Sequence, residues 1–525
     1  MRMRRFAPLL AAGVFATVVP ALAPAGASAA ETITAPSSDI LTQKPDWQRC
    51  DPELSAAYEC ATVKVPLDHR KPKGATLDVA ISRIKATDPA KRHGVLLANP
   101  GGPGGPGLDM PLLMDEHLPK EVREQYDLIG FDPRGVGRSS PISCGLTEAE
   151  QNWLRPYKAE TFAADVAWAR GVADKCRAAA KDVLPYITTR NTARDMDVIR
   201  AVLGERKISY LGYSYGTYLG AVFTEMFPQR SDRIVLDSGV DPERAWRGMI
   251  QIWAEGAEPA FRRWTQWTAQ RAAEYGLGDT PEAVSRTFWD LVARADREPI
   301  LIDGQKLTGD DIRTARPYFF YPRQAAELVK ALKAAAEGRP PAGALPEQFL
   351  RGRLQGRAGQ PAADNSTAVF LAVVCGDTDA WPRDPEQYRR DAVRDKERYP
   401  LFGDFASNVM PCAFWDRPVE KVTAVNNRTP VMTVQNEWDS QTPLASGQGL
   451  HRALKGSRMV YAAGGEGHGV YLFDQASCAN APVSAYLATG RLPYQDITCT
   501  TPPAEGQRLT RPGPVPPFPV APDRF

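Results

Sequence analysis

The chain has 525 residues, more than one compact core usually needs, because single hydrophobic cores stop growing at about 250–300 residues. Its composition, 43% hydrophobic and 24% charged, excludes the mixtures typical of disordered, collagen-like and membrane-spanning chains. Lysine and arginine number 64 against 62 acidic residues, so no excess of positive charge is available to bind nucleic acid or an anionic membrane.

The first 29 residues have the pattern of an export signal. Arginines within the first five residues precede the apolar run 6–19, and small residues follow, ending in Ala27-Ser28-Ala29. A membrane anchor would need about 20 unbroken apolar residues, whereas prolines interrupt this stretch. We predict that segment 1–29 is removed, that the chain has no stable membrane insertion, and that the mature protein is secreted and extracellular.

The next segments predict a parallel α/β sheet. A run at 77–84 alternates apolar and polar residues like a half-exposed strand. From residue 95 the apolar runs lose this alternation, as in strands that are buried on both faces. Strand and helix patterns then alternate, which indicates a mostly parallel sheet. The predicted strands are 61–65, 77–84, 95–98, 128–131, 208–211 and 234–236, and the predicted helices are 192–203 and 215–227.

Beyond residue 241 strand and helix patterns no longer alternate. Residues 245–400 are rich in Trp, Ala, Arg and Glu at helical spacing and show few strand signals, and the strand pattern resumes at 431–434 and 459–462, with a helix at 446–454 between them. The sheet is therefore divided in sequence by an insertion. We predict a core at 30–240, a helical cap at 241–410, the C-terminal part of the core at 411–500 and a Pro-rich tail at 501–525.

Eight cysteines in an exported chain predict disulfides. Their spacing falls into four local couples, although the sequence alone does not choose among the possible connectivities. The alternative is a metal site, but there is no C-x-x-C motif and there are only five histidines, so we expect no metal and no cofactor. The predicted pairs are Cys50–Cys60, Cys144–Cys176, Cys375–Cys412 and Cys478–Cys499.

Gly212-Tyr213-Ser214-Tyr215-Gly216 lies between a predicted strand and a predicted helix. This is the G-x-S-x-G pattern of a nucleophile elbow, in which glycines permit a very tight turn. The turn places Ser214 at the carboxyl edge of the sheet and the Tyr215 N–H at a helix start, where it can donate to an oxyanion. An ordinary strand-to-helix turn is the alternative interpretation.

A second oxyanion donor should come from the loop after an earlier strand. The glycine-rich segment 99–105 follows the strand at 95–98, and we choose the N–H of Gly102. A phosphate-binding loop is the competing interpretation. It is disfavoured because no G-K-[ST] ends the segment and two prolines remove N–H donors.

A serine nucleophile needs a base, and the base needs a carboxylate that holds its tautomer. In this fold the chain order is serine, acid, histidine, which leaves His451 and His468 as bases. His468 lies in a glycine-rich loop past the last predicted strand and is our choice, whereas His451 lies within a predicted helix. For the acid we choose Asp439, at the turn that leads to Thr-Pro, with Glu437 as the alternative.

These motifs resemble those of a known family. Asn-Pro-Gly-Gly-Pro-Gly-Gly at 99–105, Gly-Phe-Asp-Pro-Arg-Gly-Val-Gly at 130–137, the segment 191–200, the serine elbow and the two loops after it look like the secreted bacterial tripeptidyl aminopeptidases. These belong to the α/β-hydrolase superfamily and are related to the proline iminopeptidases. The similarity runs from about residue 50 to 499, and Tyr213 departs from the smaller residue of the family pattern.

The resemblance implies an α/β-hydrolase fold with a helical cap and a serine exopeptidase that removes tripeptides from free peptide N-termini through an acyl-enzyme. Ser214, Asp439 and His468 fall at the triad positions. Such an enzyme needs a carboxylate for the substrate ammonium, and the candidates are Glu243, Asp377 and Asp379.

The expected partners are therefore peptides with a free N-terminus, and we expect a monomer. Two alternatives stay open from the sequence. One is a secreted carboxylesterase or lipase that uses the same triad, and the other is an inactive binding protein of the cell envelope.

Overall fold

The computed structural model describes residues 38–302, 304–340 and 362–501. The predicted signal 1–29 and all but the first residue of the predicted tail 501–525 lie outside the described residues. In the described ranges no helix is both long enough and apolar enough to cross a membrane. The same residues contain no group of three or more His, Cys, Asp or Glu side chains that could hold a metal ion.

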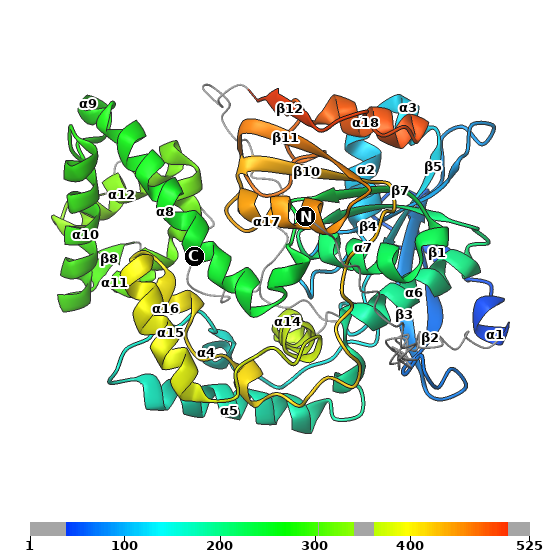
Figure 1. Ribbon diagram of the computed structural model, residues 1–525, viewed down its shortest axis with the longest axis horizontal. Helices are drawn as coiled ribbons and strands as arrows, with labels where there is room; N and C mark the ends of the chain where they lie inside the picture. Colours follow the sequence, from blue (N-terminus) through cyan, green and yellow to red (C-terminus); the bar gives the residue numbers. More distant parts are fainter. Residues whose placement is uncertain (1–37, 303, 341–361, 502–525) are drawn as a thin grey trace, which may run out of the picture.

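A ten-stranded sheet forms the centre of the molecule (Figure 1). The strand order is β1-β2-β3-β5-β4-β6-β7-β10-β11-β12. The pairs from β1 to β5 are antiparallel, and all pairs from β5 to β12 are parallel. The strands are β1 (Gln48–Arg49), β2 (Glu59–Pro66), β3 (Thr76–Ile84), β4 (Gly94–Asn99), β5 (Tyr126–Phe131), β6 (Ile208–Tyr213), β7 (Ser231–Asp237), β10 (Val431–Trp438), β11 (Ser457–Glu466) and β12 (Ile497–Thr500).

The burial of these strands explains their sequence patterns. Every residue of β4 and β6 is buried, because helices cover both faces of the parallel part of the sheet. Side chains 96 and 98 of β4 pack into one hydrophobic cluster, and side chains 95 and 97 pack into another on the opposite face. The predicted α/β-hydrolase fold and its mostly parallel sheet are thus confirmed, and β12 is an edge strand that the sequence pattern did not indicate.

Helices lie on both faces of the sheet (Figure 1). Residues of α2, α3 and α18 share one hydrophobic cluster with the strands, and residues of α6, α7 and α17 share the other. The bounds are α2 (Met110–His117), α3 (Lys120–Arg123), α18 (Asn480–Thr489), α6 (Thr189–Val202), α7 (Tyr215–Met226) and α17 (Leu444–Ala453). The short elements beside them are α1 (Ser38–Leu41), η1 (Leu184–Tyr186), η2 (Pro228–Arg230) and η3 (Pro242–Arg244).

The inserted segment builds a second hydrophobic core, at the left in Figure 1. Its centre is a cluster of aromatic rings that includes Phe261, Trp264, Phe288 and Phe319. The short β8–β9 hairpin within it was not expected from the sequence. The elements are α8 (Arg247–Ala269), α9 (Ala272–Tyr275), α10 (Pro281–Arg297), β8 (Ile300–Ile302), β9 (Gln305–Leu307), α11 (Gly309–Thr314), η4 (Arg316–Phe320) and α12 (Pro322–Ala336).

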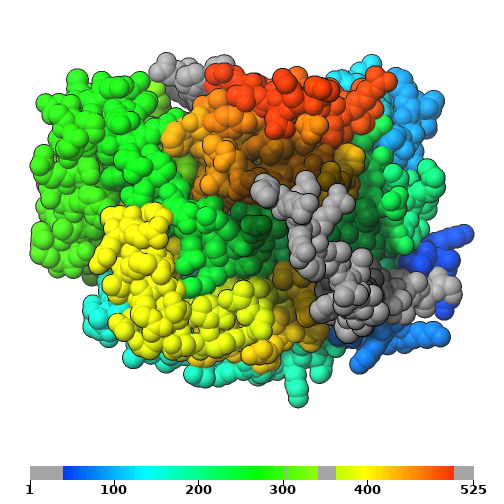
Figure 2. All heavy atoms as spheres, in the orientation of Figure 1, coloured from blue at the N-terminus to red at the C-terminus, as the bar shows by residue number. Residues whose placement is uncertain are grey.

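The later part of the insertion packs with the sheet cluster instead. Phe370 of α14 stacks on Trp153, with ring centroids 5.0 Å apart, and α5 contacts η5. In the space-filling view the yellow segment near residue 400 adjoins the green cap (Figure 2). The predicted domain boundaries at 241 and 410 stay a prediction. The elements of this part of the insertion are α14 (Asn365–Gly376), α15 (Pro385–Arg398) and α16 (Gly403–Ala406), and the elements beside them are α4 (Glu148–Gln151), α5 (Phe162–Ala179) and η5 (Pro411–Phe414).

All four predicted disulfides are present. Each joins cysteines that are between 10 and 37 residues apart in sequence, and no described cysteine is free. Because each disulfide closes a local loop, it restricts the unfolded chain and stabilises the fold. The pairs are Cys50–Cys60, Cys144–Cys176, Cys375–Cys412 and Cys478–Cys499.

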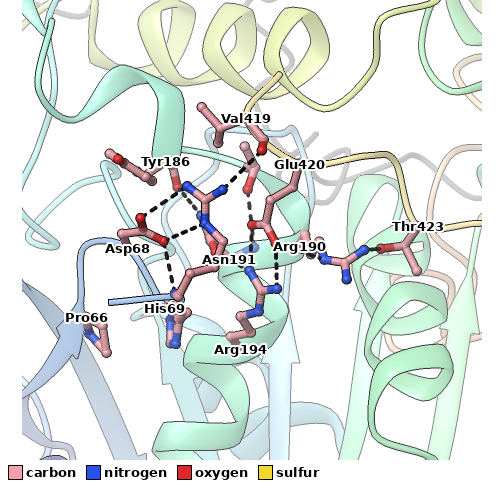
Figure 3. A network of polar contacts seen from close by, with 12 residues as sticks. Pro66, Asp68, His69, Tyr186, Arg190, Asn191, Arg194, Val419, Glu420 and Thr423 are labelled. Atoms are coloured by element: carbon pink, nitrogen blue, oxygen red, sulfur yellow. Dashed lines mark hydrogen bonds and ion pairs between the residues drawn. The ribbon is translucent and has the colours of Figure 1, made fainter. Parts of the chain in front are cut away.

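A network of charged side chains fastens the segment between η5 and β10 to α6 (Figure 3). Glu420 accepts two hydrogen bonds from Arg194, each of 2.7 Å, and lies 3.4 Å from the Nε of Arg190. Burial by itself would raise the pKa of Glu420, but the arginines around it outweigh burial and hold that pKa below its usual value. The carboxylate is therefore ionised at neutral pH and compensates the buried cation of Arg194 and the partly buried cation of Arg190.

Replacing Glu420 with Gln should lower the free energy of unfolding at pH 7 by roughly 2–4 kcal/mol, because the buried Arg194 and the partly buried Arg190 lose their counter-ion. Since the pKa of Glu420 is lowered, the difference between wild type and variant should shrink as the pH falls below about 4. Urea denaturation at both pH values checks this. Glu386→Gln removes an exposed ion pair with Arg389 and should change stability by less than about 0.5 kcal/mol. Equal losses in the two variants would contradict the prediction.

Candidate active site

Ser214 lies at the sharp turn between β6 and α7. Its backbone has a φ of 56° and a ψ of −124°, a conformation that L-residues rarely adopt. A Cβ at Gly212 would lie 2.5 Å from the carbonyl oxygen of Gly216, and a Cβ at Gly216 would lie 2.8 Å from the carbonyl oxygen of Asn99. Both glycines of the elbow are therefore required by packing. The Ser214 side chain is buried, and no described residue forms a hydrogen bond with its Oγ.

The glycine-rich loop 99–105 lies directly over this serine. A Cβ at Gly101 would be 2.9 Å from the Cβ of Ser214, and the Gly101 N–H donates to the side chain of Asn99 at 3.0 Å. This leaves the neighbouring Gly102 amide as the candidate oxyanion donor on this loop. The Tyr215 N–H is the other candidate, because Tyr215 is the first residue of α7 and the N–H groups at a helix start have no acceptor within the helix.

The predicted acid and base meet at the carboxyl ends of β10 and β11. The Nδ1 of His468 lies 2.9 and 3.0 Å from the two carboxylate oxygens of Asp439, and both side chains are buried. The Asp439 carboxylate also accepts hydrogen bonds from the N–H groups of Gln441 and Thr442 and from the Thr442 hydroxyl, at 2.8 to 2.9 Å. Burial would raise the pKa of Asp439, but His468 and these donors outweigh burial and lower it.

The alternative residues lie elsewhere. His451, on α17, contacts Ser457 at 2.7 Å and Asp496 at 3.1 Å. Glu437 accepts a hydrogen bond from the N–H of Gly464 at 2.7 Å. Among the described residues Glu437 and His451 do not pair with each other, whereas Asp439 and His468 do, so this pairing favours the original choices.

The loop that carries His468 folds back over β7, the strand between β6 and β10. The N–H groups of residues 470–471 donate to the carboxylate of Asp237, the shortest bond being 2.7 Å, and the N–H of Gly469 donates to the Ser238 hydroxyl at 2.8 Å. The Asp237 carbonyl in turn accepts a hydrogen bond from the N–H of Ser214 at 3.0 Å. One residue of β7 therefore connects the histidine loop to the serine elbow.

Sequence reasoning missed Asp237 and Thr442. Asp237 is fully buried, and burial raises its pKa to about 7, although the hydrogen bonds from Tyr471, Ser238 and Val470 oppose that shift. The one signal in the sequence is an acidic residue directly after the apolar run 234–236. Nothing in the sequence indicated that its carboxylate would hold a loop more than 230 residues away.

The three candidate amine ligands have different environments. Asp377 is buried and accepts hydrogen bonds from the N–H and hydroxyl of Thr189, at 2.8 and 2.5 Å, and from Trp246 at 3.0 Å. Burial raises the pKa of Asp377 to about 6. The carboxylate of Asp379 is half-exposed and pairs with two surface arginines.

Glu243, in η3, is exposed, and no described residue forms an ion pair with its carboxylate. The structure therefore does not gather Glu243, Asp377 and Asp379 into one cluster, and Glu243 is the carboxylate left available for a ligand.

The buried carboxyl of Asp237 predicts an unusual pH dependence of stability. Its pKa of about 7 in the folded protein exceeds the ordinary value of about 4, so the stabilisation by the protonated group is fully present below pH ~4 and is lost as the pH rises through ~7. Replacing Asp237 with Asn removes this titration. Between pH 5 and 8 wild type should lose roughly 2–3 kcal/mol more unfolding free energy than Asp237→Asn.

Urea denaturation at the two pH values measures this difference. The control is Asp78→Asn, which changes an exposed carboxylate and should keep the wild-type pH dependence. A pH dependence in Asp237→Asn that equals that of wild type would contradict the assignment.

Comparison with known proteins agrees with this geometry. Residues 94–293 match the alpha/beta hydrolase fold family, and residues 399–499 match the family described as TAP-like protein. A tripeptidyl aminopeptidase of Streptomyces lividans is 36% identical over 481 residues, which cover 86% of each chain. The serine protease Hip1 of Mycobacterium tuberculosis is 30% identical over 492 residues, or 87% of this chain and 91% of the relative.

A third relative has a different name. Carboxylesterase B of Mycobacterium tuberculosis is 30% identical over 518 residues, which cover 94% of this chain and 97% of the relative. Two of these three relatives are peptidases by name, and all three match over most of their length. The chain therefore belongs to the tripeptidyl aminopeptidase family of α/β-hydrolases, and it is a serine hydrolase of the peptidase type.

Proposed function

We propose that the chain releases tripeptides, or short N-terminal peptides, from peptides with a free N-terminus. The observation that carries this proposal is the buried Asp439–His468 pair. Asp237 binds the loop of His468 through its carboxylate and the N–H of Ser214 through its carbonyl oxygen. The relatives named tripeptidyl aminopeptidase support the choice of substrate.

In the proposed mechanism, Ser214 attacks the carbonyl carbon after the third residue of the substrate. His468 takes the serine proton and passes it to the leaving amine, while Asp439 holds the imidazole and stabilises its charged form. The N–H groups of Gly102 and Tyr215 bind the oxyanion. Water then hydrolyses the acyl-enzyme, again with His468 as the base. No step requires a cofactor.

We propose Glu243 as the group that receives the substrate ammonium, because its carboxylate has no charged partner among the described residues and follows β7 at the carboxyl edge of the sheet. Asp377 and Asp379 are weaker candidates, since their oxygens already bind other groups.

We also propose that the protein is secreted. Four disulfides support this, because such bonds persist in oxidising compartments.

Carboxylesterase activity is the second candidate function. The relative named Carboxylesterase B favours it, and the triad chemistry would be the same. The two functions differ in what surrounds the acyl group: a peptidase of this type needs a charged partner for an ammonium, whereas an esterase needs only an apolar pocket.

Replacing Ser214 with Ala should lower kcat by about a thousandfold or more, because the oxyanion donors and the binding site alone give little turnover. Folding and peptide binding should stay near wild type, as measured by thermal unfolding and by competition with substrate. Ser285→Ala, on α10 of the cap, is the control and should keep full activity. More than about a thousandth of wild-type kcat in Ser214→Ala would exclude the assigned nucleophile.

A tripeptide anilide, its N-acetylated twin and a short-chain nitrophenyl ester distinguish the two functions. Acetylation removes the charge of the ammonium, so kcat/KM for the anilide should fall by about 10- to 100-fold. Equal rates for the two anilides, together with faster turnover of the ester, would favour the esterase and contradict the aminopeptidase.

A further inference from the structure

The cap contacts the loop that carries Asp439. The Nη1 of Arg316, in η4, donates to the carbonyl oxygen of Ser440 at 2.7 Å. The Nε1 of Trp253, in α8, donates to the carbonyl oxygen of Gln441 at 2.5 Å. These are the two peptide carbonyls directly after the catalytic acid, and α8 also contacts α17, the helix that follows this loop.

The cap also contacts the loop that carries His468. Arg263 of α8 forms an ion pair with Glu466, two residues before the histidine. The hydroxyl of Tyr321 lies 3.3 Å from the position that a Cβ at Gly467 would occupy. Cap side chains therefore fix both halves of the acid–base pair from the side opposite the sheet.

Arg316 is unusual among these contacts, because it is a buried cation without a carboxylate beside it. Its side chain is 5% exposed, and no described carboxylate lies within ion-pair distance. The rings of Trp253 and Phe402 lie 5.3 and 4.9 Å from its Cζ. Burial lowers the pKa of Arg316 to about 9, and the charge of Asp439 is what opposes this shift. A buried charge of this kind is costly unless another charge compensates it.

We propose that Arg316 is a positioning residue for the catalytic acid. It holds the loop through the Ser440 carbonyl and supplies positive charge near the Asp439 carboxylate, so that the acid stays ionised and aimed at the Nδ1 of His468. The cap then positions the catalytic acid in addition to covering the site. This inference rests on the proposed triad.

Other titratable groups also face the acid–base pair. Tyr321 reaches it from the cap, Glu466 from the end of β11 and Asp237 from the end of β7. Arg316 is a cation of the cap that interacts with the charge of Asp439. Loss of this charge should favour the protonated imidazole, so the acid limb of the kcat/KM profile should move to higher pH.

The test compares Arg316→Gln with Arg316→Lys. The first substitution removes the positive charge, and the second keeps the charge but removes the planar guanidinium group. For Arg316→Gln we expect kcat to fall by about 10- to 100-fold with KM within about threefold of wild type, and the acid limb to rise by about 0.5 pH unit. For Arg316→Lys we expect a smaller loss of kcat, of about fivefold, and an unchanged acid limb.

The control is Arg123→Gln. Arg123 is also buried and donates to backbone carbonyl oxygens, those of Lys85 and Tyr126, but it contacts neither catalytic loop. It should keep the wild-type kcat and pH profile. Thermal unfolding shows whether each variant folds; if Arg316→Gln does not, Arg316→Lys decides, and a wild-type kcat in that variant would overturn the proposal.

Labelling with a fluorophosphonate separates this proposal from the proposed triad. If wild type is not labelled at Ser214, the triad itself fails. If wild type is labelled, and a folded Arg316→Gln protein keeps the labelling rate, kcat and pH profile of wild type, then the role of Arg316 fails while the triad stands.

Discussion

The hydrogen bond between the buried carboxylate of Asp439 and the imidazole of His468 is the interaction on which the candidate site depends. It joins two loops that are adjacent only because β10 and β11 are parallel neighbours. A carboxylate that is removed from water needs donors for its oxygens, and the turn after Asp439 supplies three of them from Gln441 and Thr442. The turn chemistry of 439–442 thus keeps the acid charged inside the protein.

The sheet topology places the serine elbow at the same edge of the sheet as this pair. The carboxyl ends of parallel strands lie at one edge of a sheet, so the residues after β6, β10 and β11 share that edge although β7 lies between the first two. Asp237, the last residue of β7, bridges the separation: its carboxylate binds the histidine loop and its carbonyl binds the serine amide. The raised pKa of Asp237 indicates that this anchor costs stability at neutral pH, which is common at functional sites.

The cap contacts the loops of Asp439 and His468 directly. It has its own aromatic core, and it contacts the core of the molecule through side chains that end on the two catalytic loops. The ion pairs and hydrogen bonds across this interface also mean that the geometry of the cap affects the acid and the base directly.

The sequence by itself determined the local features, which are the buried strands and the serine elbow with its glycines. These follow from the spacing of apolar residues and from turn chemistry, which act over a few neighbouring residues. Only the tertiary structure decided that Asp377 binds Thr189 and Trp246 and that Asp379 pairs with surface arginines. It also decided that Asp237 binds the loop of His468 and that Arg316 binds the loop of Asp439. The contacts of Asp377, Asp237 and Arg316 join segments more than a hundred residues apart, and no local pattern encodes which distant partner a buried charge will find.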